Sequence, residues 1–382
     1  MWLFPGQLSA DVVSPWYFQL SELKLSKRLL IRIGAALGVY TAFLDLAGLA
    51  VSRQQAEPIL PNWFRIGGEY RARLEGPTGI GFTSTDDFYS LDRLRVKLGI
   101  RPKDWLLFYG EVQDARIFFN HHNPHANPYE NKWALWQAYS HVGSSETGWV
   151  DALAGRQVLR FGDERVIGPS DWLNVGVTFN VARVDIHHPG FEVSVVASSV
   201  VPGDNSDLHN ALQGNNLYGV YGSFQNIVPG ADFEPYVLWR VAPSSSKLPG
   251  TLNRGHLNEV TIGLHWKGDL PAAFDYDTES DGQTGSLGAS SIAAWAGYAS
   301  VGKTFRKVVA APHVFLEGNY ASGTKNPNGH EWSTFDQIYP SNHDKLGFAD
   351  EVGRRNLVHF RTEWRKSPQK SGNSNSHLKA TG

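Results

Sequence analysis

Apolar and charged positions alternate with a period of two in the part of the chain that begins near Asn62. Between residues 64 and 74, one set of alternate positions is mostly apolar and the other carries Arg65, Glu69, Arg71 and Arg73. Residues 93–101 repeat the pattern, with charged positions at Arg93, Arg95, Lys97 and Arg101. Successive side chains of a β-strand point to opposite faces of a sheet. The pattern therefore predicts strands with one apolar face and one charged face.

Similar segments recur along the rest of the chain. After a third at 106–113, further segments lie near residues 133–142, 149–160, 176–186, 190–201, 215–226, 232–242, 256–267, 271–279, 291–302, 312–322 and 354–365. This amounts to about 14 candidate strands, and helical periodicity is scarcely visible among them. Short turns such as 101–104 alternate with long polar loops at 120–132, 202–215 and 323–353. Strands of about ten residues joined by alternating short and long connections are typical of an outer-membrane barrel.

Tryptophan residues lie in or beside the candidate strands, many near strand ends: Trp63, Trp105, Trp149, Trp172, Trp239, Trp266, Trp295 and Trp364. Amphipathic rings favour the boundary between hydrocarbon and headgroups. A soluble β-sandwich or a sugar-binding protein would also use such rings. Rows of cations down single strands, however, are tolerated where they line a water-filled lumen. The pattern predicts an all-β fold, an antiparallel transmembrane β-barrel.

Composition excludes several classes of protein. The 382 residues include 35 Lys and Arg against 37 Asp and Glu, whereas a nucleic-acid-binding protein would usually carry a basic excess. The absence of Cys excludes a disulfide scaffold, a Cys-ligated metal site and a cysteine nucleophile. The mean hydropathy of −0.31 is typical of a soluble protein. A barrel strand that is half apolar and half charged gives the same average, so this value does not exclude the membrane.

The N-terminal region has the pattern of a secretory signal peptide. Lys27 and Arg28 precede an uncharged run at 33–44, and Ala50-Val51-Ser52 supplies a small-residue cleavage step. The run of 12 residues is too short for a transmembrane helix, and no later segment is long and apolar enough for one. We expect residues 1–52 to be an N-terminal extension with the signal peptide, residues 1–26 being an overextended start. The mature chain is then exported.

Charges on the first two strands suggest what the lumen passes. These strands carry three acidic residues, Glu69, Glu75 and Asp92, and seven basic ones: Arg65, Arg71, Arg73, Arg93, Arg95, Lys97 and Arg101. Rings of Arg and Lys favour anions, and Arg pairs bidentately with carboxylates, which suits a uronic-acid polymer. Porins of other kinds also carry charged lumens. Five further acidic residues have two explanations. They are counter-charges that prevent the substrate from binding too tightly, or they are residues of loops or turns near the rim of the barrel: Asp185, Glu259, Asp275, Asp277 and Glu279.

Enzymatic and metal sites find little support. Asp163 and Glu164 stand beside Arg165, but a turn explains them better than an acid/base pair. The histidines of segment 120–125 lack a carboxylate at ligand spacing, so a polar loop is expected and no metal or cofactor. No nucleophile elbow, phosphate loop or dinucleotide fingerprint occurs. The alternative from another class is a secreted carbohydrate-binding protein or glycoside hydrolase, which would explain the aromatic residues and carboxylates but not the basic strand faces.

Several motifs together resemble the alginate export porin family. The most specific is the Gly-Arg-Gln…Phe-Gly-Asp-Glu-Arg block at 155–165, followed by Asp-Trp-Leu-Asn-Val-Gly at 171–176. Weaker matches, in the family order, lie at 68–73, 110–116, 274–277, 335–337 and 339–343. Together they extend through most of residues 62–360. Val177 and Asn180 stand where the family commonly has Arg and Asp, so the charge map of the pore differs.

The resemblance implies an 18-stranded outer-membrane barrel with an Arg-rich constriction that passes an anionic polysaccharide outward. It implies lumen-lining cations at Arg71, Arg73, Arg93, Arg95, Arg156 and Arg183, with Asp185 as an acidic counterpart; the strand alternation adds Arg65. The expected partners are an anionic polysaccharide or small anions, outer-membrane lipid and periplasmic export proteins. A general anion or nutrient porin is the alternative. Because the family continues for several more strands, we expect a barrel domain at 53–365 that is incomplete at its C-terminus, and a tail at 366–382 outside the native barrel.

Overall fold

The computed structural model describes residues 8–10, 61–79, 83–144, 148–201, 214–225, 227–243, 255–308, 310–347, 350 and 352–366. The predicted signal peptide at 27–52 and residues 367–382 lie outside this part of the chain. The strands are β1 (Leu8–Ala10), β2 (Phe64–Gly76), β3 (Tyr89–Lys103), β4 (Leu106–Phe118), β5 (Asn131–Val142), β6 (Val150–Gln157), β7 (Thr178–His188), β8 (Phe191–Val201), β9 (Asn216–Gln225), β10 (Ala231–Ala242), β11 (Leu257–Leu270), β12 (Phe274–Leu287), β13 (Ser290–Thr304), β14 (Pro312–Ala321), β15 (Glu331–Trp332) and β16 (Leu357–Lys366). The short helices are η2 (Pro271–Ala273) and α3 (His343–Leu346).

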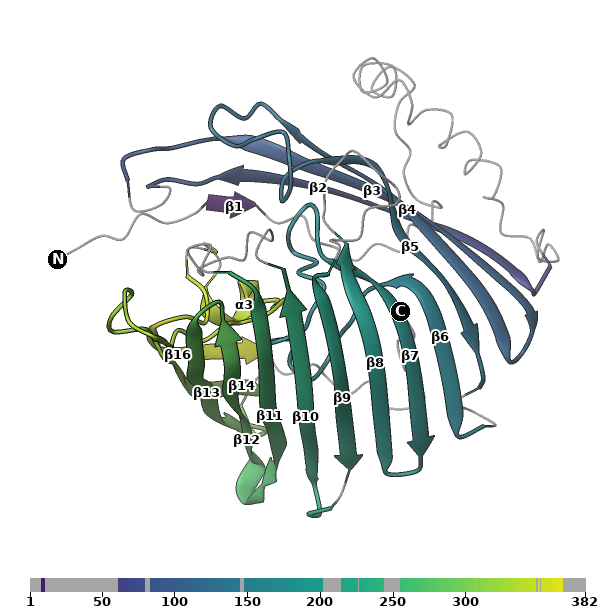
Figure 1. Ribbon diagram of the computed structural model, residues 1–382. Helices are drawn as coiled ribbons and strands as arrows, with labels where there is room; N and C mark the ends of the chain where they lie inside the picture. The colour runs from purple at the N-terminus through teal and green to yellow at the C-terminus, as the bar shows by residue number, and fades with distance from the viewer. Residues whose placement is uncertain are drawn as a thin grey trace.

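The described strands form one sheet in which each long strand pairs antiparallel with the next (Figure 1). β1 and β15 are short, and the other fourteen strands have eight to fifteen residues. These fourteen correspond to the candidate strands of the sequence, so the all-β antiparallel expectation is confirmed. Within the described ranges the path runs from β1 to β16 without pairing its two ends, so the sheet is open. No helix in those ranges has the length and apolar character needed to cross a bilayer.

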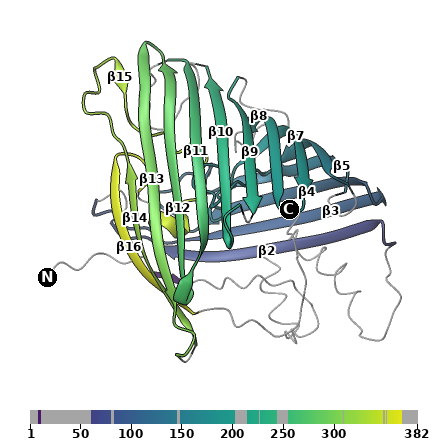
Figure 2. The same ribbon diagram turned by 90° about the horizontal axis from the view of Figure 1, so that it is seen from below.

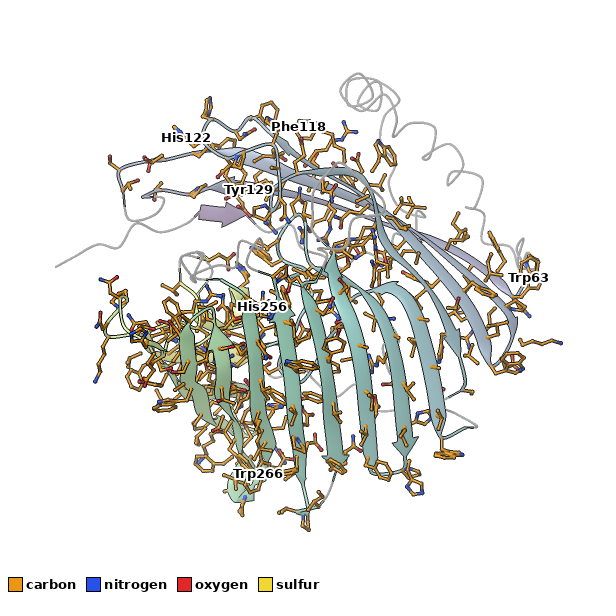
Figure 3. All side chains as sticks on the ribbon, in the orientation of Figure 1. Trp63, Phe118, His122, Tyr129, His256 and Trp266 are labelled. Carbon is orange, nitrogen blue, oxygen red and sulfur yellow. The ribbon has the colours of Figure 1, made fainter. Side chains whose placement is uncertain are left out.

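The sheet curls around an interior. In Figure 2, β2 and β3 run across the direction of β10–β13, and loops lie between these two parts of the sheet. Turns at 104–105, 189–190 and 271–273 join strands at one end, whereas loops at 119–130, 158–177 and 322–356 join them at the other. In Figure 3, Trp63 and Trp266 lie at the short-turn end, and His122 and Tyr129 lie on the long-loop side. The predicted alternation of short and long connections is therefore present.

The outer face of the sheet is apolar. On β11 the outward Ile262 is 58% exposed, whereas its inward neighbour Thr261 is 1% exposed. Aromatic side chains cross-pair near both ends of the strands, with ring centroids 6.1 Å apart for Phe233 and Trp266 at the short-turn end. At the long-loop end, the Trp295 and Tyr320 rings stack at 4.2 Å. An apolar band between two aromatic rows is the surface that a barrel presents to lipid.

The inner face is not polar throughout, which differs from the expectation of a charged, water-filled lumen. Strands β7–β10 turn Val181, Val196, Leu217 and Leu238 inward, where they form one buried cluster with apolar residues of the 158–177 loop. These strands carry apolar residues on both faces, since the outward Val195 is also exposed on the lipid side. On these strands the inward charged residues, such as Asp185 of β7 and Glu234 of β10, therefore share the inner face with this apolar cluster.

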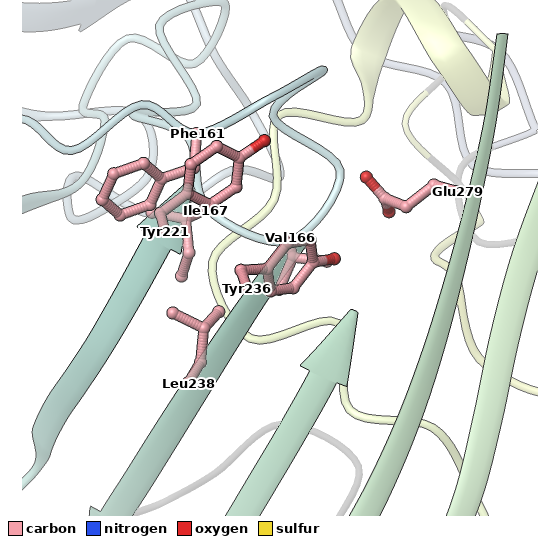
Figure 4. Close-up of a pocket in the computed structure, with 7 residues that line it drawn as sticks. All are labelled: Phe161, Val166, Ile167, Tyr221, Tyr236, Leu238 and Glu279. Carbon is pink, nitrogen blue, oxygen red and sulfur yellow. The ribbon is translucent and has the colours of Figure 1, made fainter. Parts of the chain in front are cut away.

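This apolar cluster is closely packed. Figure 4 shows the residues that line a small cavity here, of about 10 Å³: Phe161, Val166, Ile167, Tyr221, Tyr236, Leu238 and Glu279. Such a volume has room for one water molecule at most. The loop is thus held to β9 and β10 by buried apolar contacts.

Candidate functional site

The connection between β6 and β7 folds back into the interior. This segment, residues 158–177, is called the inner loop below. It contains the sequence block that resembles the family, and its apolar residues lie on the inner face of β7–β10. Its polar residues contact β2 and β3 on one side and β13 and β14 on the other. The inner loop therefore crosses the interior and narrows the space that the sheet surrounds.

Four arginines of β2 and β3 surround the tip of the inner loop: Arg71, Arg73, Arg93 and Arg95, the arginine cluster. Arg71 donates to the carbonyl oxygens of Asp171 and Leu173 at 2.9 and 3.0 Å. Arg93 donates to the same two oxygens at 3.0 and 3.2 Å. Arg73 donates to the Trp172 carbonyl at 2.6 Å, and its guanidinium carbon lies 4.0 Å from the Trp172 ring centroid. The tip is held by hydrogen bonds to its main chain and by one cation–π contact.

Carboxylates offset the charge of the arginine cluster. Asp171 Oδ1 lies 2.8 Å from Arg95 Nη1 and 3.2 Å from Arg93 Nη1. Three more carboxylates contact the cluster. Glu69 pairs with Arg93, and Glu75 pairs with Arg73. Glu111 lies 3.8 Å from Arg95. Four guanidinium groups thus face four carboxylates. Any preference for anions has to come from the hydrogen-bond donors that remain accessible rather than from a large net charge.

The Asp171 carboxylate is ionised at neutral pH. Burial raises the pKa of this carboxyl group, but the nearby guanidinium groups of Arg93 and Arg95 lower it further, and the pKa lies well below its usual range. The loop tip therefore presents a permanent negative charge to the arginine cluster.

The structure brings together four of the eight residues predicted for the lumen, namely the members of the arginine cluster. Arg65 is exposed near the short-turn end of β2, away from the cluster. On β6, Arg156 donates to Asn180 Oδ1 at 3.2 Å. On β7, Arg183 pairs with Asp185 at 2.6 Å, so this predicted cation and its predicted acidic counterpart contact each other.

The facing wall, β10–β14, carries most of the inward carboxylates. His265 lies between two of them, with Nδ1 2.7 Å from Glu234 and Nε2 2.7 Å from Asp277. From the inner loop, Arg165 reaches this wall and contacts Glu317 at 3.0 Å. The five acidic positions left open by the sequence all lie within strands, not in loops: Asp185, Glu259, Asp275, Asp277 and Glu279. Asp275, near the short-turn end, pairs with His313.

A second interior segment, the loop 322–356 between β14 and β16, packs against the inner loop. Main-chain hydrogen bonds join the two loops, from Gly168 N to Tyr339 O at 2.7 Å and from Tyr339 N to Val166 O at 3.0 Å. Their side chains also meet, because the His343 ring stacks on Trp172 with centroids 3.7 Å apart. The two loops form one layer inside the sheet.

Sequence reasoning missed the loop residues of this site. Asp171 and Trp172 belong to the motif that carries the family resemblance, but nothing in strand periodicity assigns a loop residue to the interior. Gln113, which accepts a hydrogen bond from Arg95 at 2.8 Å, is one uncharged position among many in its strand. The one available signal was the family motif itself.

The structure shows no evident metal centre. No group of three or more His, Asp or Glu side chains in the described ranges has the arrangement of a metal site. In the histidine-rich loop, His125 lies beside Glu130 at 3.2 Å, and His121 lies beside Asp87 at 3.4 Å. Main-chain N–H groups of His121 and His122 also donate to the Asp87 carboxylate. These hydrogen bonds join the β4–β5 loop to the β2–β3 loop.

Comparisons with known proteins agree on the kind of fold. A family model described as alginate export matches residues 62–378. A search of curated proteins gave no significant match. Among solved structures, OccK8 (OprE) of Pseudomonas aeruginosa is 9% identical with a TM-score of 0.50, over 79% of this chain and 78% of that chain. The likeness to this outer-membrane porin shows the fold alone.

Two further porin structures match less well. OprB of Pseudomonas putida is 10% identical with a TM-score of 0.46, over 79% of this chain and 84% of that chain. OccD3 (OpdP) of Pseudomonas aeruginosa is 11% identical with a TM-score of 0.40, over 73% of this chain. The chain spans 60% of the length of OccD3.

Proposed function

Because the chain belongs to the alginate export family, we propose that it is a channel that passes an anionic polysaccharide, an alginate-like polyuronate, along the arginine cluster. The protein is located in the outer membrane, as its family and porin-like fold indicate. The observation that carries the proposal is the meeting of four arginines from two adjacent strands with an interior loop. Guanidinium groups bind carboxylates in a planar, bidentate geometry, and each unit of a polyuronate carries one carboxylate.

The charge balance of the interior supports passage rather than tight binding. A polymer that moves stepwise needs sites strong enough to admit each unit and weak enough to release it. In the arginine cluster, resident carboxylates already engage the guanidinium groups, so an incoming carboxylate gains only the difference between two similar contacts. The carboxylates of the facing wall are also paired, Glu317 with Arg165 and Arg361, and Glu279 with Arg354, so that wall offers no guanidinium group free of a carboxylate at these positions.

A general anion porin is the second candidate. The equal number of guanidinium groups and carboxylates in the cluster favours it, because such mixed rows give small solutes a weak and non-selective preference. The two functions differ in the solute that blocks the channel. A polyuronate channel is blocked by oligouronates at concentrations at which an uncharged oligosaccharide of the same length has no effect, whereas a general porin shows no such difference.

Reversal potentials and oligouronate block in planar bilayers test the proposal. Arg71→Ala with Arg95→Ala removes two guanidinium groups and leaves carboxylates in excess, so anion preference should become cation preference and block should weaken at least tenfold. The matched control removes two cations outside the cluster, Arg65→Ala with Arg160→Ala, and should change neither quantity. Equal behaviour of both double variants, each verified as folded by its heat-modifiable mobility, would exclude the arginine cluster as the selective site.

Export of the chain is a further proposal that rests on residues 27–52. We infer that this segment acts as a cleaved signal peptide and that the barrel domain follows it. N-terminal sequencing of the protein recovered from outer membranes should begin near Arg53. A start at Met1 in that fraction would contradict the proposed cleavage.

A further inference from the structure

We propose that the Asp171 carboxylate is a built-in competitor: it occupies a carboxylate-binding site formed by Arg93, Arg95 and Gln113, and an anionic group of the passing solute displaces it. This proposal rests on the proposed function, since it specifies how the arginine cluster binds and releases an anion. It assigns to Asp171 the control of affinity in that site. It differs from a fixed structural role, in which the carboxylate would only hold the inner loop.

Unused hydrogen-bond donors show that the site has more capacity than Asp171 fills. Arg95 Nη2 is buried and has no hydrogen-bond partner among the described residues. Gln113 accepts from Arg95 Nε at 2.8 Å through Oε1, while its own buried Nε2 has no partner in the same part of the chain. Leaving a buried donor without an acceptor is energetically unfavourable. Two such donors on adjacent side chains indicate a site for a further acceptor.

Asp171 occupies only part of this site. One oxygen of the carboxylate, Oδ1, lies within reach of both Arg95 Nη1 and Arg93 Nη1, so the two guanidinium groups share it. The carboxylate side chain is 42% exposed, whereas the Arg93 and Arg95 side chains are almost fully buried. Asp171 therefore covers the two arginines and is itself open to solvent from the interior side.

The carboxylate can leave without moving the inner loop. On one side of Asp171, the Ser170 hydroxyl donates to the Pro340 carbonyl at 2.6 Å. On the other side, Asn174 Nδ2 is bonded to the carbonyl oxygens of Tyr129 and Arg116 at 2.8 and 3.0 Å. With the main chain held at both sides, rotation of the Asp171 side chain is enough to expose Arg95.

Exchange of one carboxylate for another keeps Arg95 paired throughout. An incoming uronate group replaces Asp171 on Arg95 and finds the free donors as well. When it moves on, Asp171 returns and prevents the next group from being held too long. Removal of this carboxylate should therefore strengthen binding and slow release.

The experiment compares Asp171→Asn with Asp163→Asn in the full-length protein in planar bilayers. Asp163 is on the same inner loop, but it pairs with Arg165 on the other wall at 2.9 Å, so its substitution removes the same charge outside the cluster. The probe is an oligouronate of defined length, with an uncharged oligosaccharide of equal length alongside. Asp171→Asn should lower the blocking concentration and lengthen individual blocks by about tenfold. Asp163→Asn should leave both near the wild-type values.

The outcomes separate this inference from the proposed function. Unchanged or weaker block in a folded Asp171→Asn protein overturns the competitor role. If the Arg71→Ala, Arg95→Ala variant still loses its anion preference, the proposed function survives that result. Equal strengthening in both Asn variants also overturns the inference, because it would reflect the overall field of the interior. If Asp171→Asn folds poorly, Asp171→Glu supplies the second test: a longer side chain with the same charge should keep block within about threefold of wild type, and a tenfold change would contradict competition.

Discussion

Asn174 shows how strongly the position of the inner loop depends on one side chain. Its amide nitrogen lies 2.8, 3.0 and 3.3 Å from the carbonyl oxygens of Tyr129, Arg116 and Asp92, which belong to a long loop and two strands. The side chain is almost completely buried. A single amide thus joins the loop tip to three separate segments of the wall.

Truncation of this residue should loosen the loop tip. Asn174→Ala leaves buried carbonyl oxygens without a donor, which we expect to lower the free energy of unfolding by about 1–3 kcal/mol. Denaturant titration of the protein folded in lipid vesicles measures the change. The control, Asn326→Ala, removes an exposed amide and should cost less than about 0.5 kcal/mol. Equal costs would show that the Asn174 contacts do not hold the loop.

At this scale the sequence predicted the strand residues of the site but not its loop residues. Arg71, Arg73, Arg93 and Arg95 follow from alternation, since a strand residue's face depends only on its parity. Asp171 lies in a segment without period, and its contacts join positions about a hundred residues apart. Such contacts depend on how the whole sheet curls, which no local pattern encodes.

Among the elements, the inner loop is the one that connects distant strands. Its Arg165 contacts side chains of β14, with Nη2 3.0 Å from Glu317 and Nη1 2.9 Å from Asn319. The guanidinium carbon also lies 3.5 Å from the Tyr298 ring centroid. Arg165 and Glu317 are both buried, and Arg361 is the other guanidinium on Glu317, at 3.0 Å, so removal of Arg165 takes one of two charge partners from a poorly solvated carboxylate.

Arg165→Ala should therefore destabilise the protein by about 3 kcal/mol, as expected for a broken buried ion pair. Arg160→Ala, five residues earlier on the same loop, removes an exposed pair with Glu164 and should cost less than about 1 kcal/mol. Unfolding in denaturant distinguishes them. A cost for Arg165→Ala as small as that of Arg160→Ala would mean that the contact with β14 contributes little to stability.

Strands and loops differ in how far the sequence predicts them. The fourteen long strands were predicted because a surface with lipid on one side and the interior on the other imposes a period of two. β12 extends further than predicted, to Leu287; its inward polar residues Asp281 and Gln283 are buried, whereas residues 280, 282 and 284 are exposed on the outer face. The apolar inner face of β7–β10 was not predicted, because a strand buried on both faces resembles one that is apolar on its lipid side alone.

On the scale of the whole molecule, the two faces of the sheet have different solvents. The outer face presents apolar side chains between two aromatic rows, and the inner face carries the charged clusters and the loops. Mean hydropathy averages these faces and so gives no sign of the membrane. The alternation of apolar and polar residues along each strand does indicate the membrane. The fold class could therefore be predicted, whereas the loops that fill the interior could not.

A charge placed on the outer face should reveal the lipid directly. Ile262→Arg lies near the middle of β11 and should cost about 2–4 kcal/mol of folding free energy in lipid vesicles. Leu270→Arg, on the same face at the short-turn end, should cost about 0–1 kcal/mol because an interfacial Arg reaches water. Both residues are exposed. Equal costs would contradict a membrane-spanning position for this strand.

The path of the inner loop also constrains the order of assembly. Arg71 and Asp171, which are in contact, lie 100 positions apart in the sequence, and Arg165 and Asn319 lie 154 positions apart. The longer closure carries the larger entropy cost and needs strands that lie much further along the chain. The arginine cluster can therefore close around the loop tip while only the first half of the sheet exists. We expect the loop then to serve as a template against which β13, β14 and β16 pack, so that the interior is organised before the last strands pair.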